Sequence, residues 1–260
     1  MRTERLNQME EYILQKGTAT LYDLESHFNI SIFTVRRDVA ALIERGRIRK
    51  VYGGVSSIAA QDAQPPMQLL PLAQRAAMHA QEKQIIGELA AKLAPPNSVV
   101  FLDSGSTTPF MLPHLADRGV TVVTHSLNVM VEAAKYPGLK LLALGGMLDR
   151  YTFSYIGNTS AMLRSIHPQV LFMAATALSS EWGASNNTYD EYRMKEEITS
   201  LYSNIVVLAD SSKLDRNASY TYCPFSHIKA IVTDRAPSSR FMEAVKKHGI
   251  ALHCPELAGV

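Results

Sequence analysis

Small hydroxyl residues and a glycine follow a hydrophobic segment in the first half of the chain, in the run Asp103-Ser104-Gly105-Ser106-Thr107-Thr108. A glycine lets the backbone approach a ligand closely, and the hydroxyl groups can donate hydrogen bonds to it. A helix that begins at Pro109 would add free backbone N–H groups and the positive end of its dipole. This combination is typical of a site that holds a phosphate group, although such a run also occurs as an ordinary helix cap.

Three further loops carry polar residues or glycines directly after predicted strands. They contain His125-Ser126, Gly145-Gly146 and Asp210-Ser211-Ser212-Lys213. Ligands of an open parallel sheet bind beyond the carboxyl ends of its strands, so we expect these loops to lie near the first one. Asp210 is also a common turn residue and Lys213 a common surface residue. Together they are able to hold sugar hydroxyls and a phosphate, with the lysine acting as a point charge.

A basic segment points to a second kind of chemistry. The 26 Lys and Arg residues nearly balance the 24 Asp and Glu residues of the chain, but the excess of positive charge lies within residues 31–55. The basic residues of this segment are Arg36, Arg37, Arg45, Arg47, Arg49 and Lys50. Arginine is the preferred donor to guanine edges and to phosphates, which favours contact with nucleic acid. A solvated charged face is the alternative interpretation.

The elements that must position these basic residues are three short helices and a hairpin. Apolar residues recur at helical spacing in each helix, and Thr20 and Ser31 are suited to cap the second and third helices. The third helix places Phe33, Thr34 and Arg37 opposite its apolar stripe, with Arg36 on the flank. Two helices joined by a tight turn match a helix-turn-helix. Residues 47–55 predict a hairpin, or wing, whose Arg47, Arg49 and Lys50 would meet the DNA backbone. A three-helix bundle that binds no nucleic acid stays an alternative.

From residue 73 onward, short apolar runs alternate with helical stretches. Strands are predicted at 99–102, 120–124, 139–144, 170–174, 205–209, 230–233 and 250–253. Helices are predicted at 81–93, 109–116, 127–135, 160–166, 190–202 and 238–248. This alternation indicates an α/β fold, with a mostly parallel sheet covered by helices on both faces. We therefore expect a DNA-binding domain at 1–57, a linker at 58–72 that contains Pro65-Pro66, and an effector-binding domain at 73–260.

Composition excludes several other classes of protein. The 260 residues are 47% hydrophobic, enough for a large core, and two cysteines exclude a disulfide framework. No signal peptide and no membrane-spanning run is expected, so we predict a cytoplasmic protein without a membrane partner. No cofactor is expected. The spacing of His248, His253 and Cys254 fits no ordinary metal site, and no catalytic Ser-His-Asp or Cys-His set can be placed.

The N-terminal motif resembles that of the DeoR family of bacterial transcriptional regulators. The matching residues are the run Ser31-Ile32-Phe33-Thr34-Val35-Arg36-Arg37-Asp38-Val39, followed by Leu42, Gly46, Arg49 and Tyr52-Gly53-Gly54-Val55. The family begins with a winged helix-turn-helix whose recognition helix reads Ser-x-x-Thr-[Ile/Val]-Arg-[Arg/Lys]-Asp-Leu. The resemblance implies that Thr34, Arg36 and Arg37 contact DNA, with Phe33 as a weaker candidate.

The second region resembles the sensor domain of the same family. Its loops are similar to the family motifs Asp-x-Gly-[Ser/Thr]-Thr, Thr-Asn-Ser, Gly-Gly, Glu-x-x-x-Lys and Asp-[His/Ser]-[Ser/Thr]-Lys. Glu191 and Lys195 fill the fourth motif, and Thr233-Asp234 follows. The resemblance implies the fold of ribose-5-phosphate isomerase and a phosphorylated sugar or polyol as effector. The chain departs from the family at His125, which replaces an asparagine, at Ala174 and Ala177, which replace glycines, and at Leu214-Asp215.

Three functions are open at this point. A DNA-binding repressor, whose operator binding is relieved by a phosphorylated sugar, fits both regions; its repressing sign is implied by the resemblance. An isomerase-like enzyme with an accessory N-terminal domain could use Asp103, Glu191 and Asp210 as acid or base. A scaffold protein could use the N-terminal module for protein contacts. We predict the repressor and no enzymatic activity, because an isomerase has no use for Arg36, Arg37 and a basic wing. A homo-oligomer, dimer or tetramer, is expected because two half-sites need two recognition helices.

Overall fold

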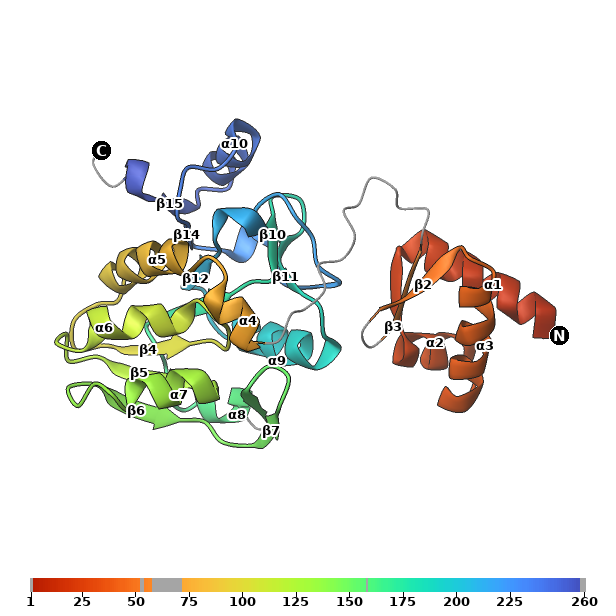
Figure 1. Cartoon of the computed structure of the whole chain (residues 1–260), viewed down its shortest axis with the longest axis horizontal. Helices are drawn as coiled ribbons and strands as arrows, with labels where there is room; N and C mark the ends of the chain where they lie inside the picture. The colour runs from red at the N-terminus through yellow and green to blue at the C-terminus, as the bar shows by residue number, and fades with distance from the viewer. Residues whose placement is uncertain (1, 52–53, 58–71, 158, 258–260) are drawn as a thin grey trace. The chain divides into compact units, whose positions relative to one another are not determined.

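The computed structural model describes residues 2–51, 54–57, 72–157 and 159–257. By its internal contacts the chain divides into two compact units, formed mainly by Met1–Pro66 and mainly by Met67–Val260 (Figure 1). The predicted linker at 58–72 lies outside the described residues except for Leu72, as do Tyr52 and Gly53 of the predicted wing, so these domain boundaries stay predictions.

The N-terminal unit contains three helices and a small sheet. Its elements are α1 (Arg2–Lys16), β1 (Thr18–Thr20), α2 (Leu21–Phe28), α3 (Ile32–Glu44), β2 (Ile48–Val51) and β3 (Gly54–Ser57). The antiparallel sheet has the order β1-β3-β2, so the predicted wing is present as β2 and β3. The strand β1 was not expected. It is only three residues long, and it exists because β3 supplies its hydrogen-bonding partner.

The predicted caps explain where α2 and α3 begin and end. The Thr20 hydroxyl accepts a hydrogen bond from the backbone N–H of Asp23 at 2.9 Å, and the Asp23 carboxylate accepts one from the backbone N–H of Thr20 at 3.0 Å. Asn29 ends α2 in the left-handed region at φ 49°. The Ser31 hydroxyl then caps α3 by accepting from the backbone N–H of Thr34 at 3.4 Å. This tight turn fixes the direction in which α3 leaves α2.

The larger unit is built on a seven-stranded parallel sheet, as expected. Its order is β15-β14-β12-β9-β4-β5-β6, and every neighbouring pair is parallel. The strands are β4 (Val99–Leu102), β5 (Thr121–Thr124), β6 (Lys140–Ala143), β9 (Val170–Ala174), β12 (Ile205–Leu208), β14 (Ala230–Val232) and β15 (Ala251–His253). All seven lie where continuous apolar runs predicted them, because such runs suit strands that are buried on both faces.

Helices cover both faces of this sheet (Figure 1). On one face, α5 (Ala80–Lys92), η1 (Thr108–Met111), α6 (Leu112–Leu115) and α7 (Leu127–Ala133) pack in one hydrophobic cluster with residues such as Val100 and Phe172. On the other face, α8 (Thr159–Leu163), α9 (Tyr189–Ser200) and α10 (Ser239–Lys247) pack in a second cluster with residues such as Phe101 and Leu171. The alternation of strand residues between the two clusters is the two-residue period of a β-strand.

The structure corrects the prediction of one α-helix at 109–116. The segment is a 3-10 helix, η1, followed by the four-residue α6. Pro113 is the physical reason, because it has no N–H to donate to the carbonyl group of Pro109 and so interrupts α-helical bonding. The helix dipole that we expected behind the Ser104–Thr107 loop is therefore reduced to a short 3-10 turn.

Several short elements were not predicted. A second sheet joins β10 (Ala177–Ser179), β11 (Gly183–Asn186) and β13 (Tyr220–Cys223), and β7 (Met147–Asp149) pairs with β8 (Ser154–Ile156). The helix α4 (Leu72–Ala77) and three 3-10 turns, η2 (Ser211–Lys213), η3 (Phe225–His227) and η4 (Pro255–Leu257), complete the chain. Among the described residues, no helix combines the length and the apolar character that crossing a membrane requires.

Candidate functional site

The candidate DNA-binding residues form a largely exposed surface on the N-terminal unit. Phe33, Arg36 and Arg37 of α3 are exposed, whereas Val35, Val39 and Leu42 of the same helix are buried in the core of the unit. Ser31, Arg47 and Lys50 are also exposed, and Thr34 and Arg49 are half-buried. The hydroxyl groups of Ser31 and Thr34 lie 3.0 Å apart and contribute to the cap of α3. The arrangement presents three cationic or aromatic side chains from the first turns of one helix.

Ion pairs connect α1 to α3 and to the residues that follow α3. Asp38 is completely buried on α3, and its Oδ2 atom accepts hydrogen bonds from Arg5 of α1, with Nε at 2.8 Å and Nη2 at 2.7 Å. Glu10 of α1 pairs with Arg45 at 3.1 Å and lies 3.9 Å from Arg47. The Arg47 side chain remains 63% exposed despite this long contact, so it is accessible from solvent. The acidic residues Glu10 and Asp38 fix the orientation of α3 and of the start of the wing.

In the larger unit, a buried ion-pair cluster lies where β4 and β9 end. The Lys195 ammonium group lies 2.8 Å from Asp103 Oδ2 and 2.9 Å from Glu191 Oε1, and it also donates to the carbonyl oxygen of Ala174 at 2.8 Å. The backbone N–H of Ala174 donates to Asp103 Oδ2 at 2.9 Å. Burial disfavours the charge of Lys195, but the two carboxylates more than offset it and raise its pKa. The predicted Glu191–Lys195 pair is therefore joined to the predicted Asp103.

His125 completes this cluster from the end of β5. Its imidazole ring is fully buried and stacks on Phe101 at 5.6 Å, and Nε2 lies 3.8 Å from Asp103 Oδ1. Burial, with the Lys195 charge nearby, lowers the pKa of His125 to about 3. The ring is therefore neutral at physiological pH, with one N–H donor and one acceptor nitrogen available to a polar ligand.

Several buried polar atoms at the strand ends make no hydrogen bond within the described part of the chain. They are Asp103 Oδ1, Ser104 Oγ, Thr107 Oγ1, both ring nitrogens of His125, both side-chain atoms of Asn186, and Thr233 Oγ1. Burying an unsatisfied polar group costs on the order of 1–3 kcal/mol. Asp103, Ser104, His125 and Thr233 follow strands of the parallel sheet, and such a concentration of unsatisfied donors and acceptors is typical of a site for a polar ligand. Asn186, which ends β11 of the smaller antiparallel sheet, is a further unsatisfied residue that the sequence did not indicate.

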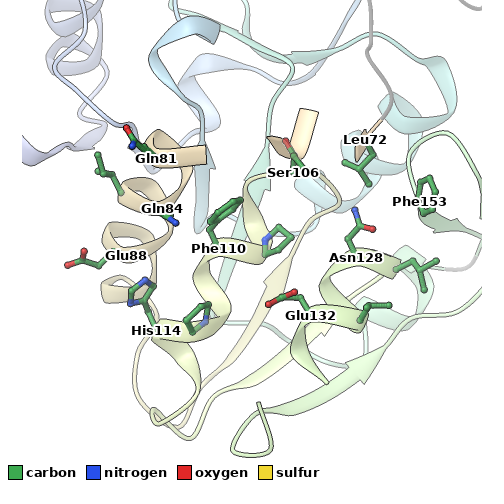
Figure 2. Close-up of a pocket in the computed structure, with 17 residues that line it drawn as sticks. Leu72, Gln81, Gln84, Glu88, Ser106, Phe110, His114, Asn128, Glu132 and Phe153 are labelled. Atoms are coloured by element: carbon green, nitrogen blue, oxygen red, sulfur yellow. The ribbon is translucent and has the colours of Figure 1, made fainter. Parts of the chain in front are cut away.

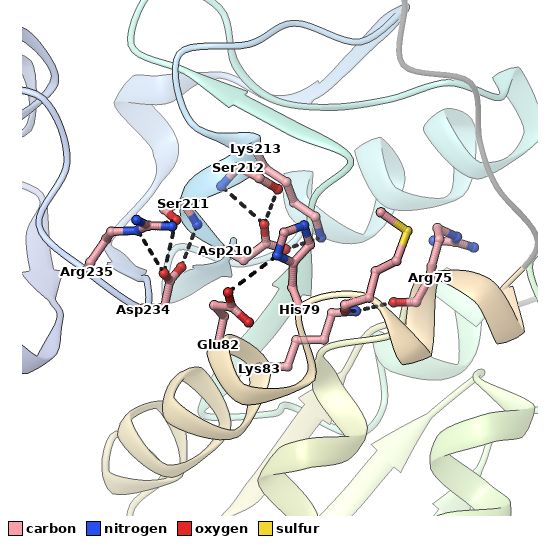
Figure 3. Close-up of polar contacts among 11 residues, drawn as sticks. Arg75, His79, Glu82, Lys83, Asp210, Ser211, Ser212, Lys213, Asp234 and Arg235 are labelled. Carbon is pink, nitrogen blue, oxygen red and sulfur yellow. Dashed lines mark hydrogen bonds and ion pairs between the residues drawn. The ribbon is translucent and has the colours of Figure 1, made fainter.

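Figure 3 shows three cationic side chains, Arg75 of α4, Lys83 of α5 and Lys213 after β12. Lys213 pairs with Asp210 at 3.3 Å, and the Asp210 carboxylate also accepts from the backbone N–H of Ser212 at 3.2 Å. Lys83 of α5 is almost fully buried and donates to the carbonyl oxygens of Arg75 and, at 2.7 Å, Met78. Burial and the neighbouring charges of Lys213 and Arg75 lower the pKa of Lys83 to about 8. The carboxylates of Asp210 and Glu191 act in the opposite direction on the pKa values of Lys83 and Arg75, so this mixed cluster of charges is a candidate site for an anionic ligand.

Arg75 and Lys83 were missed by the sequence analysis. Both precede the first strand of the sheet, and a lysine within a helix is ordinarily solvated. The one available signal was that Lys83 falls between Gln81 and Ile86, close to the buried stripe of the predicted helix. The structure brings both residues next to Lys213, 130 positions after Lys83 in the sequence.

The other residues that the sequence predicted for the effector site differ in their burial and hydrogen bonding. Thr108 is buried, and its hydroxyl donates to the carbonyl oxygen of Asp103 at 2.8 Å, which closes the loop. Ser126 caps α7 by accepting from the backbone N–H of Val129 at 3.4 Å. Gly145 and Gly146 are exposed, and a Cβ atom at Gly146 would lie 2.4 Å from the carbonyl oxygen of Ile156. Packing against β8 is thus a sufficient reason for that glycine, and its contact with an effector stays a prediction.

Gly105 and Ser106 also line a groove with a volume of about 1310 Å³ (Figure 2). Its walls come from α4, α5, the η1–α6 segment and α7, and they are mainly apolar, with Leu72, Phe110 and Phe153 among them. A Cβ atom at Gly105 would lie 2.7 Å from the Cβ atom of Ala174, so this position requires glycine. Within the described residues, no group of three or more His, Cys, Asp or Glu side chains is arranged to hold a metal ion.

Comparison with known families matches both regions. Residues 5–61 match the DeoR-like helix-turn-helix domain, and residues 78–235 match the DeoR C-terminal sensor domain. The HTH-type transcriptional regulator IolR of Bacillus subtilis (strain 168) is 35% identical over 255 residues, which are 97% of this chain and 99% of that protein. The glycerol-3-phosphate regulon repressor of Escherichia coli (strain K12) is 27% identical over 253 residues, which are 96% of this chain and 98% of the repressor.

Among solved structures, ribose 5-phosphate isomerase A from Neisseria gonorrhoeae aligns with a TM-score of 0.38 and 17% identity. The alignment covers 52% of this chain and about half, 53%, of the isomerase chain. The family assignment depends on the sequence matches, which span both units and include the helix-turn-helix and the sensor loops. This chain belongs to the DeoR family and is a transcriptional regulator with a DNA-binding helix-turn-helix domain and a C-terminal sensor domain.

Proposed function

We propose that this protein represses a sugar or polyol catabolic operon in the cytoplasm and releases its operator when a phosphorylated sugar or polyol binds the sensor domain. The single observation that carries the proposal is the group of unsatisfied buried polar atoms beside three cations at the carboxyl ends of the parallel strands. The name of one relative, a repressor of a glycerol-3-phosphate regulon, supports an effector of this chemical class. We propose no resident cofactor or metal ion.

The charges divide the site into two ends. We assign the phosphate to the side of Lys83, Lys213 and Arg75, where a dianion relieves the mutual repulsion of the cations, with Ser104 and Thr107 as hydroxyl donors. We assign the sugar hydroxyls to His125, Asp210 and the free Oδ1 atom of Asp103. Ser106 and Gly105 border this site at the groove.

We infer that the site binds its ligand without chemical turnover. An acid or base at carbon needs a carboxylate that is free to exchange a proton. Lys195 instead holds both Asp103 and Glu191 in short ion pairs. Operator binding is assigned to Arg36 and Arg37 of α3, supported by Thr34 and Ser31 at its start and by Arg47, Arg49 and Lys50 of the wing. A homo-oligomer would supply one recognition helix to each of two half-sites.

Operator release measured against matched ligand pairs tests this proposal. An operator duplex is first selected from random sequences with the full-length protein, and its release is followed by fluorescence anisotropy. Each sugar or polyol is compared with its phosphate ester. Charge-assisted hydrogen bonds are worth roughly 1.5–3 kcal/mol each, so the active ester should act at a concentration at least about a hundredfold lower than the free sugar.

Two variants locate the phosphate. Lys213→Met and Ser106→Asp should both bind the operator as the wild type does, but should require far more ester for release. A free sugar that releases DNA as well as its ester, or a Ser106→Asp protein with an unchanged response, would contradict this assignment.

A further inference from the structure

Phe33 is an unusually exposed aromatic residue in the first turn of the recognition helix. The residue is 78% exposed, although Val35, Val39 and Leu42 on the opposite side of α3 are buried. Single exposed apolar residues are common on protein surfaces and carry no meaning by themselves. The position of Phe33 is informative, because the first turns of a recognition helix are the part that reaches base edges in the major groove.

The neighbours of Phe33 on α3 are cationic. Residues three and four positions apart lie side by side on a helix, so Phe33 is adjacent to Arg36 and Arg37, and Ala40 follows one turn later. All four residues are exposed. With Lys50 also exposed on β2, this surface complements the negative charge of a nucleic-acid duplex, which identifies DNA as its occupant.

The chemistry of the phenyl ring limits what it can recognise. It has no hydrogen-bond donor or acceptor, so contact with the polar edge of guanine, cytosine or adenine would remove that edge from water without compensation. Thymine alone presents an apolar group in the major groove, its C5 methyl group. We propose that Phe33 is a specificity-determining residue that selects a thymine in the operator through this methyl group.

The helix geometry also places that thymine. Phe33 and Arg37 are four residues apart, slightly more than one helical turn, or about 6 Å along the axis. Adjacent base pairs are about 3.4 Å apart. The selected thymine therefore lies within about two base pairs of the base that Arg37 contacts. This inference rests on the proposed DNA-binding role of α3.

Removal of single methyl groups from the operator tests the proposal. Each thymine of the selected operator is replaced in turn by deoxyuridine, which differs only by the missing C5 methyl group. Kd is measured for wild type, Phe33→Ala and Phe33→Leu. At one thymine per half-site, the wild type should lose about fourfold in affinity, the equivalent of the roughly 0.8 kcal/mol that burial of a methyl-sized group contributes. Phe33→Ala should bind both duplexes equally, and Phe33→Leu should retain part of the preference.

The controls separate this inference from the function on which it rests. Because Phe33 is exposed, all three proteins should have the same melting temperature and the same oligomeric state. A Phe33→Ala protein that still prefers thymine to uracil at every position would overturn the inference, as would a change in oligomeric state without loss of the preference. Failure of the wild type to bind any duplex would instead contradict the proposed DNA binding.

Discussion

At the scale of single residues, Lys83 is a candidate effector contact that its place in the sequence did not reveal. Lys83 is buried beside Lys213 and Arg75, and its ammonium group donates to the carbonyl oxygens of Arg75 in α4 and of Met78 directly after it. An ammonium group has three donors, so one remains for a ligand. The cost of burying this charge is visible in its pKa, which falls to about 8 from an ordinary value of 10.5.

The lowered pKa of Lys83 predicts how effector binding depends on pH. Below about pH 8 the side chain is charged and attracts the phosphate; above that value it becomes neutral and the attraction is lost. Effector affinity should therefore be nearly constant from pH 7 to 8 and should fall above pH 8, by at most about tenfold per pH unit. Isothermal titration across this range measures the effect.

Two variants serve as controls for this prediction. Lys83→Met should bind weakly at pH 7 and show little further loss up to pH 9. Lys83→Arg keeps its charge throughout, so its affinity should also be flat but higher than that of Lys83→Met. A wild-type affinity that is unchanged between pH 7.5 and pH 9 would show that Lys83 does not contact the effector.

At the scale of elements, α3 depends on α1 for its orientation. The buried Asp38 carboxylate contacts Arg5 through Nε at 2.8 Å and Nη2 at 2.7 Å. Removing one partner of a buried pair leaves the other uncompensated, although Arg5 is partly exposed and can turn to solvent. We expect Asp38→Ala to destabilise the N-terminal unit by roughly 2–3 kcal/mol.

The comparison with Arg36→Ala separates stability from DNA contact. Arg36 is exposed, so its loss should weaken operator binding without lowering the melting temperature of the protein. Asp38→Ala should lower both the operator affinity and the melting temperature. The double mutant Asp38→Ala/Arg5→Ala should be only slightly less stable than Asp38→Ala alone. Additive losses in that double-mutant cycle would show that the two residues act independently.

Some elements of the fold could be predicted from the sequence and others could not. The seven strands of the parallel sheet were identifiable because runs such as Val170–Ala174 are continuously apolar. The strand β11 was not, because Gly183–Asn186 has no β-branched residue and is a strand only through its pairing with β10 and β13. The motifs that contain Asp103, Glu191 and Lys195 were recognisable one by one, whereas only tertiary packing brings Arg75 and Lys83 to the candidate site.

At the scale of the whole molecule, the proposed DNA-binding residues and the proposed effector site belong to different compact units. Effector binding and operator binding can therefore be measured separately on the full-length chain. An effector that binds the folded sensor stabilises it by RT ln(1 + [L]/Kd), which is about 2.7 kcal/mol at a hundredfold excess over Kd. Direct contact between effector and operator is not needed for one to displace the other, provided that the effector prefers one of two states of the protein.

Thermodynamic linkage allows this switch to be tested by measuring how the operator changes effector affinity. If the effector lowers operator affinity by a given factor, the operator must lower effector affinity by the same factor, typically five- to 150-fold for a coupling of roughly 1–3 kcal/mol. Effector Kd is measured for full-length protein alone, with saturating operator, and with a duplex of scrambled sequence at the same concentration. The operator should weaken effector binding by the factor found in the release experiment, and the scrambled duplex should weaken it far less. Equal effector affinity with and without the operator would show that the sensor site and α3 are not coupled, because a ligand that binds both states equally shifts neither.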